Sequence, residues 1–222
     1  MGDMKRILIT GANGNIGTIL RNGLGKDYRL TSASLPETDV RNYRSLEKLA
    51  RGKDVLIHLA WKAKTENFQT KTSDPDNILM AKNAYEAALK MGVKKVIMAS
   101  SVHADDFRNF NGSCLLSPNR APNPQTPYGR SKIKIEEMGR KYAERGLEVV
   151  CIRFGAVGYG KPTDKEGKLV WLSDADCTSL IRKIVEAKRI PNGFVVMYGV
   201  SNNKARVHDF SNPFGWKPRD RI

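Results

Sequence analysis

KRILITGANGNIG, residues 5–17, is the stretch of sequence that decides the fold. Its apolar centre predicts a short buried strand, and the glycines after it predict a tight turn from which a helix runs to Leu24. Glycine is needed where a backbone turns with positive φ or approaches a phosphate closely, and a helix N-terminus offers free N–H groups to an anion. The stretch therefore predicts a nucleotide-binding turn. Its expected cofactor contacts are Gly11, Asn13, Gly14, Asn15, Ile16 and Gly17.

The rest of the chain alternates short apolar segments with amphipathic ones. We expect further strands at 28–34, 54–59, 93–99, 147–154 and 193–200. We expect helices at 43–50, 76–91, 127–145 and 173–188. Such alternation predicts a parallel sheet that helices cover on both faces. The expected fold class is α/β, a Rossmann-like doubly wound parallel sheet with a small C-terminal substrate region.

The domain organisation follows from length and spacing. A chain of 222 residues suffices for one α/β domain with a proper core, so residues 1–222 are expected to form a single NAD(P)-binding domain. Substrate-binding elements are expected in 102–127, which holds a proline-rich loop, and in 155–222. Only four residues separate Ser34 from Asp39. The next strand there is therefore minimal, or its connecting helix is missing.

Composition narrows the location and the partners. No apolar run approaches the ~20 residues that cross a bilayer, and no secretory signal is recognisable, so we expect a cytoplasmic protein without a membrane partner. The three cysteines and three histidines lack metal-ligand spacing, which predicts no metal site. A net charge of +15 is typical of nucleic-acid binding, but the basic residues are spread among acids. We therefore expect a small-molecule substrate and no specific nucleic acid.

Tyr128 and Lys132 lie four residues apart in a predicted helix and therefore on one face of it. The ammonium group should favour the phenolate and lower the Tyr128 pKa from about 10 towards neutrality. Beside a nucleotide cofactor, such a proton-transfer pair predicts an oxidoreductase. Ser101 follows a predicted strand and would hold the substrate oxygen, with Ser100 as the adjacent alternative. His103 would either contact the substrate or cap the loop.

The end of the second predicted strand bears on the choice of cofactor. An acid there would accept hydrogen bonds from the 2′-hydroxyl of NAD and repel the 2′-phosphate of NADP. This chain has Thr31-Ser32-Ala33-Ser34 instead. Because hydroxyls on a basic surface suit a phosphate, we expect NADP or NAD with NADP favoured, and Ser32 among the contacts.

Several motifs occur in order along the chain, namely TGANGNIG at 10–17, DV at 39–40, HLA at 58–60, ASS at 99–101 and YGRSK at 128–132. Together they resemble the extended short-chain dehydrogenase/reductase family, also called the NAD-dependent epimerase/dehydratase family. The resemblance implies that Ser101, Tyr128 and Lys132 are catalytic, and that Lys132 also binds the nicotinamide ribose. It implies further cofactor contacts from Asp39, Val40, Leu59, Ala60, Trp61, Asn77, Phe154 and Val157, besides Tyr128 and Lys132.

Within the family the chain is most similar to the uronate dehydrogenases, through ASSVH at 99–103, WLSDAD at 171–176 and GWKPRD at 215–220. This likeness places Ser101, Val102 and His103 at the substrate. The chain departs from that group's pattern because Val102 replaces an asparagine and Ala156 replaces a serine. An arginine for the substrate carboxylate is missing before Trp171, and Lys165 or Lys168 is the candidate replacement.

Three functions stay open on the sequence. The first is NAD(P)-dependent oxidation or reduction of a small hydroxy or carbonyl substrate, such as a sugar or sugar acid. The second is nucleotide-sugar epimerisation or dehydration, against which the short chain after Phe154 argues. The third is a non-catalytic NADP-binding regulator. Helices 76–91 and 127–145 would pair across a two-fold axis, so we expect a homodimer or a higher homo-oligomer.

Overall fold

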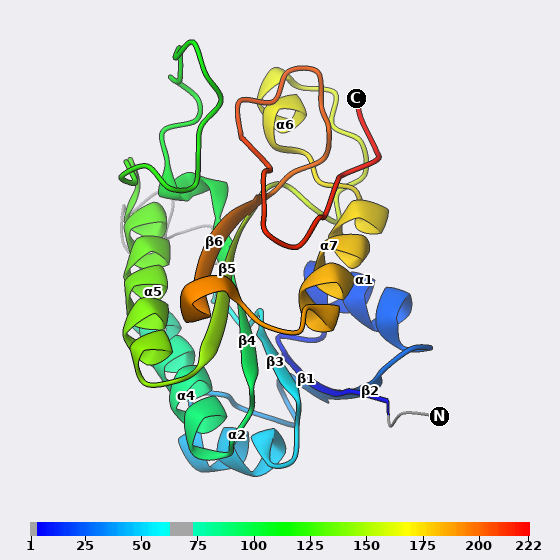
Figure 1. Ribbon diagram of the computed structural model, residues 1–222, viewed down its shortest axis with the longest axis vertical. Coiled ribbons are helices and arrows are strands. Elements are labelled where there is room, and N and C mark those ends of the chain that lie inside the picture. The colour runs from blue at the N-terminus through cyan, green and yellow to red at the C-terminus, as the bar shows by residue number, and fades with distance from the viewer. Residues whose placement is uncertain (1–3, 63–72) are drawn as a thin grey trace.

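The computed structural model describes residues 4–62 and 73–222, and its centre is a parallel six-stranded sheet (Figure 1). The strands lie in the order β2-β1-β3-β4-β5-β6. Their bounds are Arg6–Thr10 for β1, Arg29–Ala33 for β2, Val55–His58 for β3, Lys95–Ser101 for β4, Glu148–Phe154 for β5 and Phe194–Gly199 for β6. The strand order reverses between β1 and β3, which is the place where sheets of this kind bind ligands.

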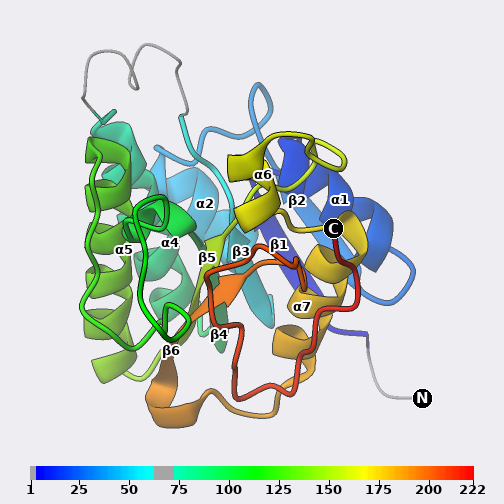
Figure 2. The same ribbon diagram turned by 90° about the horizontal axis from the view of Figure 1, so that it is seen from above.

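Helices cover both faces of the sheet (Figures 1 and 2). On one face lie α1 (Asn15–Leu24) and α7 (Asp174–Glu186). On the other lie α2 (Tyr43–Ala50), α4 (Asp76–Lys90) and α5 (Pro127–Glu144). The predicted Rossmann-like α/β class is therefore confirmed, and each predicted strand and helix is present with its bounds shifted by one or two residues.

Two local features differ from the sequence-based expectation. Between β2 and β3 the described residues form no further strand, because the chain passes from Ala33 through a short turn into α2. A short helix α6 (Lys165–Val170) was not predicted. Asp164 caps it by accepting a hydrogen bond from the Gly167 amide at 2.7 Å, so a capping signal was present in the sequence.

The alternation of side chains along each strand builds a core on each face of the sheet. In β1, Ile7 and Ile9 pack with α1 and α7, whereas Leu8 packs with α2, α4 and α5. Both sides of a parallel sheet are buried, and that explains why the strand reads as a continuous apolar run. The sheet is thereby fixed between two helical layers, and its edge strand β2 leaves Arg29 and Ser32 exposed.

The connections at the carboxyl ends of the strands gather on one side of the molecule, at the top of Figure 1. The 3-10 turn η1 (Val102–Ala104), the proline-rich loop, α6 and the C-terminal segment meet there. Isolated bridges tie Leu116 to His208 and Ala156 to Trp171. Beneath them a third apolar cluster contains Val102, Phe107, Leu116, Val170, Tyr198 and Val200.

A buried charge network holds this side of the molecule together. The guanidinium of Arg153 on β5 donates to both carboxylate oxygens of Glu136 on α5, at 2.9 and 2.8 Å, and to Asp105 at 2.8 Å. Asp105 also accepts from the Tyr198 hydroxyl, and Glu136 accepts from Ser100. The charges are almost fully buried and satisfy one another, so they link strand, helix and loop.

In the described part of the chain, no helix is long and apolar enough to cross a membrane. All three cysteines are free thiols, with Cys151 and Cys177 buried and Cys114 exposed.

Two buried histidines predict a loss of stability below neutral pH. Burial lowers the pKa of His58 and of His208 to about 3, whereas an unfolded chain titrates them near 6.5. Stability is therefore complete above pH 6.5 and falls as the pH drops. As the pH falls from 7 to 5, we expect each histidine to lower the free energy of unfolding by about 2 kcal/mol. Urea unfolding at the two pH values measures this change.

The variant His208→Leu tests this assignment. Its unfolding free energy should fall by about 2 kcal/mol less than that of the wild type across the same pH range. Aspartate and glutamate titrate mostly below pH 5, so the range isolates the histidines. Equal pH slopes for the two proteins would contradict a neutral, buried His208.

Candidate active site

A cleft of about 560 Å³ opens at the carboxyl ends of β1, β3, β4 and β5. It brings together residues that the sequence spreads over more than a hundred positions. Of the predicted residues, the following line it: Gly11, Gly14, Asn15, Ile16, Gly17, Leu59, Trp61, Ser101, Val102, His103, Tyr128, Lys132, Phe154 and Val157. The cleft begins at the point of strand-order reversal, where a dinucleotide site is expected.

The glycine-rich turn has the features of a phosphate cradle. Gly11 has a φ of +68°, and a Cβ there would lie 2.6 Å from the Ala60 amide nitrogen. A Cβ on Gly17 would lie 2.5 Å from the Gly11 carbonyl oxygen. Helix α1 begins after Gly14 without any side-chain cap, so its first N–H groups face the cleft unblocked by a side chain. These features fit a bound pyrophosphate.

The adenosine end of the predicted site lies outside the cleft lining. Asn13 donates its amide to the Ser34 hydroxyl at 3.1 Å, which ties the glycine turn to the end of β2, and Ser32 is exposed nearby. The carboxylate of Asp39 accepts from the Arg41 guanidinium at 2.9 and 2.5 Å. That contact holds the pKa of Asp39 below its usual range.

Three further predicted contacts also lie behind the cleft wall. Val40 is buried in the core. Ala60 packs beneath Gly11, and Asn77 holds the backbone of Lys62. The Asn77 side chain accepts from the Lys62 amide at 2.7 Å and donates to its carbonyl at 3.2 Å. It thus fixes the chain directly after Trp61, and a direct cofactor contact from Asn77 stays a prediction.

The predicted catalytic residues meet in the middle of the cleft. Tyr128 lies beside Ser101, whose hydroxyl lowers the pKa of the phenol, and packs edge-on against Trp61, with ring centroids 5.7 Å apart. It also packs edge-on against His103, at 5.6 Å. The Lys132 amine donates to the Ala99 carbonyl at 2.7 Å and lies 3.5 Å above the Trp61 ring. Tyrosine, serine and lysine therefore line one cleft, and their catalytic roles stay a prediction.

The protonation of this pair differs from the sequence-based expectation. Burial raises the pKa of Tyr128, although the Ser101 hydrogen bond partly offsets the rise. Burial also lowers the pKa of Lys132 to about 7. Helical spacing placed both residues on one face, but the amine turns to Ala99 and Trp61 and stays 5.6 Å from the Tyr128 ring centroid. The predicted lowering of the tyrosine pKa was therefore wrong for this arrangement.

Sequence reasoning missed several residues at the substrate end. Phe107, Gly155, Tyr159, Asp164, Glu166, Gly167 and Val170 also line the cleft. They come from the loop after η1 and from the segment that carries α6. The cap at Asp164 could have revealed α6, but no local pattern marks Phe107 as a site residue.

Comparison with known proteins agrees with this geometry. Residues 7–202 match the model of the NAD dependent epimerase/dehydratase family. An L-arabinose 1-dehydrogenase (NAD(P)(+)) of Haloferax volcanii is 28% identical over 98% of this chain and 97% of its own length. A uronate dehydrogenase of Pseudomonas syringae is 31% identical over 97% of this chain and 82% of its own length.

The likeness extends to solved structures. A uronate dehydrogenase variant from Agrobacterium tumefaciens in complex with NAD aligns with a TM-score of 0.83, at 28% identity, over 99% of this chain and 86% of that chain. The chain belongs to the NAD-dependent epimerase/dehydratase family. The sequence predicted this family, a likeness to the uronate dehydrogenases and an NAD(P)-dependent dehydrogenase. The comparisons confirm these three predictions.

Glu136 lies one helical turn beyond Lys132, and its charge raises the Lys132 pKa against the effect of burial. In Glu136→Gln that charge is lost, so we expect Lys132 to lose its proton at lower pH. The alkaline side of the pH profile of kcat/KM should move in the same direction. Glu137→Gln is the matched control, because Glu137 is exposed on the next position of the same helix. Identical profiles for the two variants would contradict the coupling.

Proposed function

We propose that this protein oxidises a sugar-type hydroxyl, or reduces the corresponding carbonyl, with Ser101, Tyr128 and Lys132 as catalytic residues. The observation that supports it most is that Ser101, Tyr128 and Lys132 line one cleft, which begins at a glycine turn with the features of a phosphate cradle. A cleft of about 560 Å³ that must hold cofactor and substrate favours a small substrate over a nucleotide sugar.

When bound, the nicotinamide supplies the hydride chemistry. The glycine turn and the N-terminus of α1 would hold its pyrophosphate, and Phe154 and Val157 would flank the ring. Tyr128 exchanges a proton with the substrate oxygen, and Ser101 orients that oxygen by a hydrogen bond. Lys132, fixed by Ala99 and Trp61, places a positive charge beside the reacting groups. Val102 and His103 border the substrate.

Tyr128→Phe tests the catalytic assignment. The phenyl ring keeps the packing against Trp61 and His103 but has no proton to exchange. We expect turnover to fall by about 10² to 10⁴, with cofactor affinity nearly unchanged. Steady-state kinetics and cofactor titration measure the two quantities, and wild-type turnover in this variant would refute the role of Tyr128.

Among cofactors, we propose NADP over NAD. The end of β2 carries Ser32 and Ser34 in place of an acid, and the Ser34 hydroxyl already contacts the glycine turn. Lys53 reaches Thr31 on the same strand at 2.9 Å, which adds positive charge there. Hydroxyls and a cation suit a 2′-phosphate, which an acid would repel.

Dissociation constants for the two cofactors test this preference. NADP should bind the wild type more tightly, and Ser32→Asp should weaken NADP binding at least about tenfold while sparing NAD. Isothermal titration with each cofactor measures both effects. Tighter binding of NAD by the wild type would overturn the preference.

The proposal includes a single domain, a cytoplasmic protein and a homo-oligomer. Helices α4 and α5 lie side by side at one face of the molecule (Figure 2), joined by stacked rings of Tyr85 and Tyr142 at 5.0 Å. Leu79 on α4 is exposed there, which suits a helical interface with a second copy.

A further inference from the structure

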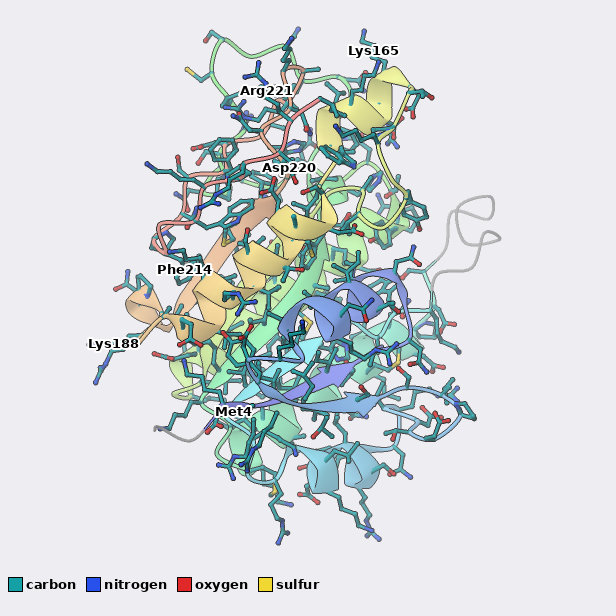
Figure 3. The ribbon with its side chains drawn as sticks, turned by 90° about the vertical axis from the view of Figure 1, so that its right-hand side faces the viewer. Met4, Lys165, Lys188, Phe214, Asp220 and Arg221 are labelled. Atoms are coloured by element: carbon teal, nitrogen blue, oxygen red, sulfur yellow. The ribbon has the colours of Figure 1, made fainter. Side chains whose placement is uncertain are left out.

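Helix α6 turns its acids to the cleft and its lysines away from it. All four of Asp164, Lys165, Glu166 and Lys168 are exposed, but only the two acids line the cleft. Figure 3 shows Lys165 at the outer end of α6, pointing away from the sheet. The two lysines expected to replace a carboxylate-binding arginine are therefore badly placed for that role, and this wall of the cleft is negative.

One of these acids, Glu166, already forms an ion pair with an arginine. Arg108, in the loop after η1, pairs with Glu166 at 2.5 Å and lies 5.1 Å from the centroid of the Phe107 ring. The pair bridges the two segments that border the substrate end. Because Glu166 occupies its guanidinium, Arg108 does not offset the charge of Asp164.

The interior of the cleft offers no further free positive charge among the described residues. Lys132 is the one lysine or arginine that lines it in residues 4–62 and 73–222, and its amine is bonded to the Ala99 carbonyl. Burial lowers the pKa of His103. Beside Tyr128, the substrate end carries the ring of Tyr159 and the apolar side chains of Val102, Phe107, Ala156 and Val170.

These features suit a polyhydroxy ligand without a charge of its own. Carboxylate oxygens accept hydrogen bonds from hydroxyl groups, and an apolar floor packs against the C–H face of a ring. A sugar acid would instead bring its carboxylate to a wall that already carries one unpaired acid, and like charges repel there. A carboxylate would also lose water of hydration, and the cleft residues within 4–62 and 73–222 offer no free cation in exchange.

We propose that the substrate is a neutral sugar, bound with its hydroxyls towards Asp164 and Glu166, in preference to a sugar acid. This inference rests on the proposed oxidoreductase function. In the oxidising direction Tyr128 first releases its own phenolic proton to water. The substrate O–H bond then breaks, and its proton passes to the Tyr128 phenolate. The C–H bond at the same carbon breaks with its electron pair, and that hydride reduces NAD(P)⁺ to NAD(P)H. The product is the corresponding carbonyl compound or lactone.

Matched pairs of sugars that differ only at the outermost carbon test the proposal. The pairs are galactose with galacturonate and glucose with glucuronate, each assayed with NAD and with NADP. We expect kcat/KM to be at least about tenfold higher for the neutral member of each pair that reacts. An equal or higher value for the sugar acid would overturn the neutral-substrate proposal while leaving the oxidoreductase function intact. Absence of turnover with every sugar and both cofactors would overturn the proposed function itself.

The charge on α6 is tested by two substitutions. Asp164→Asn keeps a good helix cap, and Glu166→Gln keeps the size of the side chain. Combined, they should raise the ratio of kcat/KM for the sugar acid to that for the neutral sugar at least about fivefold. Asp106→Asn is the matched control. Asp106 is an acid of the loop after η1 that accepts a hydrogen bond from Asn109, and it does not line the cleft. An unchanged ratio in the double variant, or the same rise in the control, would overturn the role assigned to α6.

Discussion

The buried guanidinium of Arg153 is the interaction on which the geometry of the site depends. It is 2% exposed and lies between two carboxylates, Glu136 on α5 and Asp105 directly after η1. A buried charge of this kind is stable only while its partners stay in place, and removal of one partner typically costs about 3–5 kcal/mol. Helix α5 and the η1 turn are therefore held at a fixed distance from β5.

The proposed catalytic residues inherit their positions from that network. Glu136 is on the same face of α5 as Lys132, and its other partner, Ser100, precedes Ser101 at the end of β4. The network thus sets helix and strand end against each other, and Tyr128 and Ser101 meet at the junction. Gly129 completes the fit, because any side chain there would collide with the His103 carbonyl.

The fold could be predicted from the sequence because its strands, turns and helices depend on local sequence patterns. The apolar run of β1, the glycines of the turn and the 3.6-residue spacing of α4 and α5 each depend on neighbours in sequence. The same reasoning recovered which residues share the cleft, since strand ends of a parallel sheet meet at one edge.

Sequence reasoning failed for quantities set by distant parts of the chain. The Tyr128 pKa depends on burial and on where the Lys132 amine turns, and neither is visible in a spacing of four residues. The partner of Arg108 is 58 residues away and on a helix that sequence reasoning did not predict.

Charge in this cleft is controlled at two separate places. In its interior, burial drives Tyr128 and Lys132 towards their neutral forms, and Glu136 opposes that tendency for Lys132 from behind the catalytic helix. At its mouth, α6 presents Asp164 and Glu166, and only the second has an arginine partner. The interior belongs to the rigid sheet and α5, whereas the mouth is built from connections beyond the strand ends.

A change in α6 can therefore alter which ligand enters without disturbing the proposed proton-transfer groups. Because α6 adds no strand to the sheet, we infer that discrimination between substrates resides in the connections, whereas the proposed chemistry resides at the strand ends and on α5.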